Sequence, residues 1–167
     1  FFFAKPADAV VIDGAPIAYP PQTRDLQHEI ELVVAIGKDG ANIGEHAALE
    51  HVFGYAAGLD MTRRDLQAEA KKAGRPWSMA KGFDQSAPVG TIAPAKAIGH
   101  PATGAITLSV NGAERQRGDL GDQIWSVPET IAYLSRLVTV RAGDLILTGT
   151  PAGVSPVRRR DVLEGNI

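Results

Sequence analysis

The sequence predicts one α+β domain that is mainly β, built from short strands and turns with a few helices. The chain has 167 residues, a length that suits one domain and allows a continuous core. Its 18 glycines and 11 prolines indicate many turns. Runs of β-branched residues predict the strands, and two capping patterns predict helices. No internal repeat, low-complexity linker or domain boundary interrupts them, so residues 1–167 are expected to form a single domain.

The first long strand is expected from His28 to Ile36, where the run HEIELVVAI closes at the turn signal GKDG. Side chains alternate along a strand, so Glu29 and Glu31 share one face with Val33 and Ala35. The other face is apolar and carries Ile30, Leu32, Val34 and Ile36. The strand therefore presents two carboxylates on a face that is otherwise apolar.

The middle of the chain combines short helices with strands. Residues 45–53 suit a short helix, and a strand over residues 55–59 delivers Asp60. Thr62 and Asp65 approximate a capping box for a helix that ends near Gly74. On this helix one stripe carries Arg64, Gln67 and Lys71.

The second half predicts a hairpin, a helix and a further strand. Residues 105–118 form the hairpin around the two-residue turn Asn111-Gly112. Ser126 and Glu129 make a second capping box, with Pro128 in the first turn. The helix after it is expected to turn three leucine or isoleucine side chains toward a core: Ile131, Leu134 and Leu137. A turn over residues 141–144 then leads into the strand LILTG.

Composition excludes several classes of protein. Hydrophobic residues make up 44% and charged residues 22%, as in an ordinary globular protein. The net charge of −2 gives no support for nucleic-acid binding, and the one basic run, at residues 158–160, suits a solvated turn. The absence of cysteine excludes disulfides and thiolate metal sites. No segment is apolar enough to span a membrane and no signal peptide is recognisable, so the cytoplasm is expected.

Glu29 and Glu31 are candidates for a metal site. Two carboxylates directed toward an apolar interior repel each other and lose hydration, and a divalent cation would offset both costs. Mg²⁺, Mn²⁺ and Ca²⁺ prefer carboxylate oxygens, and Asp60 at the end of another strand is a plausible third ligand. On spacing alone, however, E-x-E is weakly specific, and a solvent-facing pair near a strand end is the simpler interpretation.

The chain resembles the fumarylacetoacetate hydrolase family over nearly its whole length. The segments that carry the resemblance are FFFAKP, HEIELVVAIGK, GYAAGLDMTRRDLQ, WSMAKGFD, LSVNGAERQRGDL, IWSVPETIAYLS and GDLILTGTPAGV. Within the family, GYAAGLDMTRRDLQAEAKK and AKGFD are most similar to the branch of fumarylpyruvate hydrolases and acylpyruvases. The resemblance implies a mixed β-roll, commonly dimeric, with short peripheral helices.

The resemblance also implies a site. A Glu-x-Glu pair and a distant Asp hold a divalent metal in the family, Mg²⁺ or Mn²⁺ with Ca²⁺ as an alternative. The matching residues here are Glu29, Glu31 and Asp60. It marks four further positions as contacts of a dicarboxylate or acylpyruvate substrate: Arg64, Gln67, Lys81 and Thr150. Lys81 is also expected to stabilise negative charge during catalysis.

The implied reaction is hydrolysis of a C–C bond in an acylpyruvate such as fumarylpyruvate. The general base of the family is a His–Glu pair in a pattern like G-R-N-Y-x-x-H-x-x-E, ahead of the F-x-K-P stretch. Residues 1–167 start after that place, and we expect this core to lack the N-terminal lid and the last C-terminal strand or two. One smaller departure is Arg160, where relatives tend to have Gly before the Asp.

Two other functions remain open at this point. The same metal site serves relatives that decarboxylate oxaloacetate, or that isomerise or decarboxylate ring-cleavage products. A non-catalytic metal-binding remnant is the alternative from a different class. Among the histidines, His28 is directed away from the glutamates and is expected to be a hydrogen-bonded structural residue, and His46, His51 and His100 form no recognisable constellation.

Overall fold

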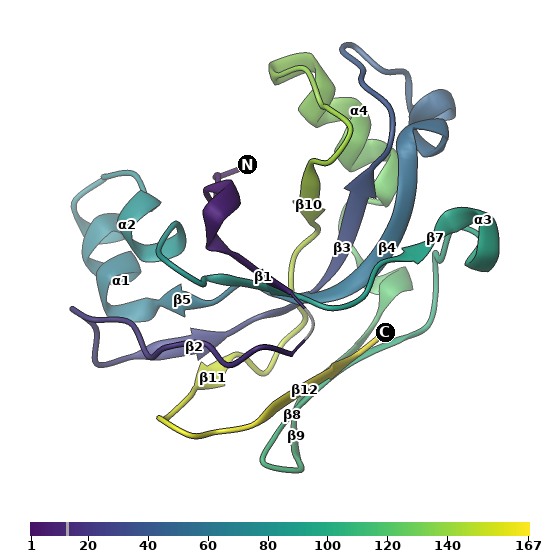
Figure 1. The fold of residues 1–167 in the computed structure, drawn as a ribbon. Coiled ribbons are helices and arrows are strands. Elements are labelled where there is room, and N and C mark those ends of the chain that lie inside the picture. Colours follow the sequence, from purple (N-terminus) through teal and green to yellow (C-terminus); the bar gives the residue numbers. More distant parts are fainter. Residues whose placement is uncertain (13) are drawn as a thin grey trace.

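The computed structural model describes residues 1–12 and 14–167 (Figure 1). In chain order the strands are β1 (Val10–Ile12), β2 (Leu26–His28), β3 (Ile30–Ile36), β4 (Val52–Leu59), β5 (Thr62–Arg63), β6 (Ala87–Val89), β7 (Ala93–Pro94), β8 (Ala105–Val110), β9 (Ala113–Asp119), β10 (Leu145–Leu147), β11 (Ser155–Pro156) and β12 (Leu163–Asn166). The helices are α1 (Arg64–Lys72), α2 (Ser78–Lys81), α3 (Ala95–Ile98) and α4 (Val127–Leu137), with 3₁₀ turns at Ala7–Ala9, Glu45–His51 and Leu120–Asp122. This confirms an α+β fold that is mainly β.

The described strands form three sheets. The largest has six strands in the order β1-β6-β4-β3-β10, and β7 also pairs with β4. A second sheet has the order β11-β2-β5 and a third the order β12-β8-β9. The pairing of β1 with β6 is parallel and the other pairings are antiparallel, so the fold is mixed as expected.

Two bent antiparallel strands connect the first two sheets. β3 pairs with β4 from Ile30 opposite Leu59 onward, while β2 pairs with β5 on the other side of a short break. Glu29 interrupts one strand and residues 60–61 interrupt the other. In Figure 1 the β2–β5 pair runs on from the β3–β4 pair with a change of direction. Both breaks therefore lie side by side at one bend.

Both faces of β3 are buried, in agreement with the alternation expected from the sequence. One face packs into the main core through Ile30, Leu32, Val34 and Ile36. On the opposite face Val33 packs with Ala56 and Val89. A carboxylate on this face is consequently surrounded by protein rather than by bulk water.

The hairpin and the second capping box form as predicted. Asn111 and Gly112 both have positive φ, 53° and 77°, as a tight two-residue hairpin turn requires. Ser126 and Glu129 make the reciprocal capping box of α4. The prediction for Leu137 was wrong, because its side chain is 62% exposed. Six residues separate it from Ile131, so on a helix it is rotated well away from the buried stripe.

The first capping box does not form. Thr62 belongs to β5, and α1 begins at Arg64 without a side-chain cap. Asp65 instead accepts hydrogen bonds from the Thr23 hydroxyl and the Arg24 backbone N–H. Pairing of β5 with β2 therefore prevails over the local capping pattern.

Within residues 1–12 and 14–167, no helix combines the length and the apolar character needed to cross a bilayer.

Candidate active site

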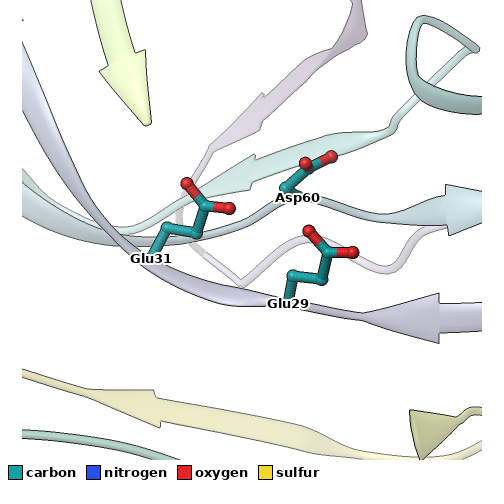
Figure 2. Close-up of side chains that lie close together, drawn as sticks. All are labelled: Glu29, Glu31 and Asp60. Atoms are coloured by element: carbon teal, nitrogen blue, oxygen red, sulfur yellow. The ribbon is translucent and has the colours of Figure 1, made fainter. Parts of the chain in front are cut away.

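The bend between the two sheets brings three carboxylates together. Glu29 lies between β2 and β3, Glu31 lies in β3, and Asp60 directly follows β4. The Asp60 backbone N–H donates to the Glu29 carbonyl at 2.9 Å, which fixes the two breaks opposite each other. One oxygen from each carboxylate lies within 4.8 Å of the others, and Figure 2 shows the three side chains converging. The three metal ligands implied by the resemblance thus meet at one place.

A glycine beside Glu31 permits this packing. Gly58 lies opposite Glu31 in the β3–β4 ladder. A Cβ atom at Gly58 would lie 2.4 Å from Val33 Cγ2, too close for any side chain. Without a side chain at residue 58, this face of the β3–β4 pair has room for Val33 beside the carboxylates.

Lys81, at the end of α2, lies in the centre of this group. Its Nζ donates to Glu29 Oε2 at 2.9 Å, to Asp60 Oδ2 at 2.6 Å and to Thr62 Oγ1 at 2.6 Å. The side chain is 2% exposed, so the ammonium group is desolvated and fully committed to these oxygens. Lys81, expected from the resemblance to contact the substrate, thus lies against the carboxylates.

Arg64 lies at the outer edge of the cluster. One guanidinium nitrogen contacts Glu29 Oε1 at 2.5 Å, and a second donates to Gln67 Oε1 at 2.7 Å. Its Nε donates to Gln27 Oε1 at 2.9 Å. The side chain of Arg64 is 26% exposed, whereas Gln67 is buried. Arg64 and Gln67 thus join the cluster through the first turn of α1.

Lys5 is a member of the site that the sequence did not single out. Its Nζ lies 2.8 Å from Asp60 Oδ1 and donates to the carbonyls of Met61 and Lys81. The side chain is 8% exposed. Lys5 belongs to the FFFAKP segment that carries the family resemblance, but a lysine ahead of a proline gives no local sign of burial.

The cations are distributed unevenly over the three carboxylates. Burial raises the pKa of Glu29, but the combined effect of Lys81 and Arg64 is larger and in the opposite direction. The pKa of Glu29 is therefore below its usual value. Burial raises the pKa of Asp60 in spite of Lys5 and Lys81. For Glu31, burial and the neighbouring Asp60 raise the pKa to about 8, opposed mainly by one hydrogen bond from the Gly149 N–H. Glu31 is therefore the carboxylate with the least compensation.

Thr150 lies in the turn that follows β10, next to Glu31. The Gly149 N–H donates to Glu31 Oε2 at 2.6 Å. The Thr150 hydroxyl donates to the Ile30 carbonyl at 2.7 Å, so its proton is held by the protein. The structure thus brings all of the expected site residues to the same region.

The histidines are engaged elsewhere. His28 is fully buried and its ring nitrogens contact Gln116 and Ser155, as expected for a structural residue. His51 contacts the Lys38 carbonyl, and His100 contacts the Tyr55 hydroxyl. These hydrogen bonds direct the three rings toward partners outside the carboxylate cluster.

The residues of the cluster fit a divalent cation. All three candidate ligands are carboxylates, the donors that hard divalent ions prefer. Asp60 Oδ1 is buried and, among the described residues, receives no hydrogen bond of acceptable geometry. Glu31 is buried beside two further carboxylates and lacks a cation of its own among the ion pairs of the described residues. An added cation at this place would compensate both.

Comparison with known proteins agrees with this geometry. A family model described as fumarylacetoacetate (FAA) hydrolase C-terminal matches residues 1–167. The crystal structure of fumarylpyruvate hydrolase from Pseudomonas aeruginosa in complex with Mn²⁺ and pyruvate is 54% identical in sequence, with a TM-score of 0.97. The match covers 99% of this chain and 73% of that chain.

Two curated relatives carry different names. The fumarylpyruvate hydrolase of Ralstonia sp is 44% identical over 167 residues, which cover 100% of this chain and 86% of the relative. The mitochondrial oxaloacetate tautomerase of Mus musculus is 46% identical over 165 residues, which cover 99% of this chain and 75% of the relative. The match of the family model to the whole chain and the level of these identities give one conclusion: the chain belongs to the fumarylacetoacetate hydrolase family.

Proposed function

We propose that this chain is the catalytic core of a metal-dependent hydrolase that cleaves a C–C bond in an acylpyruvate, with fumarylpyruvate converted to fumarate and pyruvate. The observation that carries the proposal is the buried cluster of Glu29, Glu31 and Asp60, in contact with Lys81, Lys5 and Arg64. The similarity to a structure that contains Mn²⁺ and pyruvate supports it.

The charges of the cluster suit a dianionic substrate. When all three carboxylates are ionised they face three cationic side chains, so the charges of these six protein groups cancel. A divalent ion adds positive charge, which the two carboxylates of fumarylpyruvate would compensate. A neutral substrate would leave the excess positive charge buried and uncompensated.

The four residues expected to contact the substrate have proposed parts in binding. Arg64 is the partly exposed cation, and its guanidinium can donate to a substrate carboxylate in a bidentate contact, with Gln67 holding its orientation. Lys81 is enclosed and supplies a point charge beside the reacting carbons. Thr150 lines the same region from the turn after β10.

The reaction breaks the bond between the distal carbonyl carbon and the methylene of the pyruvate unit. Water adds to that carbonyl carbon, and the electron pair of the broken bond passes to the pyruvate fragment, which then gains a proton. A bound divalent ion would supply Lewis acidity at the pyruvate end, where negative charge develops. Lys81 Nζ would stabilise the same charge through its own positive charge and without reorganising, because its position is already fixed by three oxygens.

We place the general base for the water outside residues 1–167. His28 contacts Gln116 and Ser155, while Nδ1 of His51 contacts the Lys38 carbonyl and Nδ1 of His100 the Tyr55 hydroxyl. The family resemblance implies a His–Glu pair on a lid segment ahead of FFFAKP, and we propose that pair as the base. Reading the coding sequence upstream of Phe1 for this pair tests the assignment directly.

The test of the function uses the complete polypeptide. Loss of the ultraviolet absorbance of enolised fumarylpyruvate is followed with Mn²⁺ and with EDTA, and fumarate and pyruvate are quantified. We expect equimolar products with Mn²⁺ only, and no turnover by Glu31→Gln. The matched control is Glu164→Gln on β12, an exposed carboxylate remote from the cluster, which should retain activity. Metal binding without product formation would exclude this substrate.

Oxaloacetate chemistry is the second candidate function, because the tautomerase relative is 46% identical over 165 residues. Decarboxylation of oxaloacetate, or isomerisation of a ring-cleavage product, would use the same metal site. Comparing kcat/KM for fumarylpyruvate hydrolysis, oxaloacetate enol–keto conversion and oxaloacetate decarboxylation separates these activities. A far higher kcat/KM for either oxaloacetate reaction would replace the hydrolase assignment.

We also propose Mg²⁺ or Mn²⁺ as the working ion, a homodimer as the assembly and the cytoplasm as the location. Exposed apolar side chains on and beside α4, Ile124 at 96% and Leu137 at 62%, support an association surface. Thermal shifts with Mg²⁺, Mn²⁺ and Ca²⁺ rank the ions. Light scattering of the complete polypeptide tests the dimer, and a monomeric mass would contradict it.

A further inference from the structure

A buried hydrogen-bond network lies behind β3, on the face opposite the carboxylates. Its centre is Gln116 on β9, which is 1% exposed. Gln116 Oε1 contacts His28 Nδ1 at 2.7 Å and accepts from the Ile30 N–H at 3.1 Å. Gln116 Nε2 donates to Thr150 Oγ1 at 2.8 Å and to the Pro151 carbonyl at 2.9 Å. One amide side chain therefore connects β2, β3 and the turn after β10.

The direction of every hydrogen bond in this network follows from the Ile30 backbone. Because the Ile30 N–H is a donor, the atom it contacts must be the amide oxygen of Gln116, which fixes the orientation of that amide. The amide oxygen then requires a proton on His28 Nδ1. His28 Nε2 in turn accepts from the Ser155 hydroxyl, 2.8 Å away. Burial lowers the pKa of His28, in agreement with a neutral ring.

The network ends at the turn that contacts Glu31. The Thr150 hydroxyl accepts from Gln116 and donates to the Ile30 carbonyl at 2.7 Å. Both bonds fix residue 150 against β3, and the preceding Gly149 N–H donates to Glu31 Oε2 at 2.6 Å. Gln116 therefore holds the turn through Thr150, and the backbone of the same turn holds the Glu31 carboxylate through the Gly149 N–H.

We propose that Gln116 is a positioning residue for the metal site, acting through Thr150 and the Gly149 N–H on the direction of the Glu31 carboxylate. The proposal rests on the proposed function to the extent that Glu31 is a metal ligand. It also assigns a different task to Thr150. Since the hydroxyl proton of Thr150 is held by Ile30, its side chain serves to fix the turn rather than to donate to a substrate.

The test measures Mn²⁺ affinity directly, by electron paramagnetic resonance of the free ion, on the complete polypeptide. Gln116→Met keeps the length of the side chain and removes its hydrogen bonds, and we expect Kd for Mn²⁺ to rise about tenfold, as for other residues that orient metal ligands. Thr150→Val should give a similar rise, whereas Thr150→Ser keeps the hydroxyl and should bind as wild type does. The double variant Gln116→Met/Thr150→Val should bind no more weakly than either single variant, because both remove the same connection.

Other outcomes are equally decisive. An unchanged Kd in Gln116→Met or in Thr150→Val, with only a lower melting temperature, would reduce the network to a structural role. If Gln116→Met does not fold, the comparison of Thr150→Val with Thr150→Ser answers the question. Nitrogen NMR of the metal-free wild type should find His28 neutral with the proton on Nδ1, and a proton on Nε2 would overturn the hydrogen-bond directions. Wild type that binds no Mn²⁺ would instead contradict the proposed function, and Mn²⁺ binding without hydrolysis would leave the positioning role intact.

Discussion

The two halves of the carboxylate cluster differ in how their charge is compensated. On one side Glu29 and Asp60 each contact two cationic side chains. On the other side Glu31 receives a backbone N–H from Gly149, and burial raises its pKa to about 8. Two glutamates only two residues apart in the sequence thus have opposite electrostatic environments. The difference indicates that Glu29 is balanced within the protein and Asp60 only in part, whereas the ionised form of Glu31 requires an added cation.

Mutation separates Glu29 from Glu31 most directly. Glu29→Gln leaves Lys81 and Arg64 without part of their counter-charge in a buried site, so we expect the metal-free protein to lose about 3 kcal/mol of unfolding free energy. Glu31→Gln removes a carboxylate without a cation and should change stability little or raise it. Urea unfolding in EDTA measures both variants, with Glu164→Gln as the surface control. Equal losses in the two glutamine variants would remove the distinction between the two halves.

Metal binding should stabilise the part of the cluster that contains Glu31. At a free Mn²⁺ concentration one hundred times Kd, binding to the folded state alone raises the unfolding free energy by about 2.7 kcal/mol. Wild type should show this increase and lose it on addition of EDTA. Glu31→Gln should show a much smaller increase at the same Mn²⁺ concentration. A full response in Glu31→Gln would place the ion elsewhere.

The pH dependence of stability sharpens the comparison further. The pKa of Glu31 in the folded, metal-free protein is about 8, above its ordinary value of 4.5. Between these two values the folded state holds a proton that the unfolded state has released. Stability should therefore fall as pH rises, by about 1.4 kcal/mol per pH unit, and level off above the folded pKa.

Glu31→Gln is the reference for this measurement, since it cannot titrate at this position. The difference in unfolding free energy between wild type and Glu31→Gln, measured in EDTA across this pH range, should carry the slope. A flat difference would show that Glu31 is compensated by a group other than those that contact it here.

The sequence predicted the part of the site that depends on strand alternation. The run HEIELVVAI was enough to place Glu29 and Glu31 on one face and Ile30 on the other, because a strand that is buried on both faces keeps its period of two. The expected strand end made Asp60 a plausible third ligand, and the family resemblance then marked it as one. Its contact with Glu29 depends on the pairing of β3 with β4.

The remaining part of the site depends on contacts between distant segments. Lys5 reaches the Met61 carbonyl across 56 residues, and Gln116 meets His28 across 88. Neither lysine nor glutamine shows by its type or spacing that it will be buried against such a partner. Thr62 was assigned to a helix cap for the same reason, since its pairing in β5 with the distant β2 cannot be inferred from a local pattern.

The smallest expected effect concerns the turn at Arg160, where the family resemblance leads us to expect glycine. Arg160 has a φ of 74°, a left-handed conformation that costs a residue with a Cβ about 1 kcal/mol relative to glycine. Arg160→Gly should therefore raise the unfolding free energy by up to about 1 kcal/mol, while Arg160→Ala, which removes the charge but keeps the Cβ, should not. Among the described residues, the ion-pair and hydrogen-bond partners of the three carboxylates do not include Arg160, so both variants should keep the full Mn²⁺-induced increase in stability. If Arg160→Gly lost that increase, the Mn²⁺ response would report general changes in the fold. The contrast between Glu29 and Glu31 would then have to be tested by measuring Mn²⁺ binding rather than unfolding.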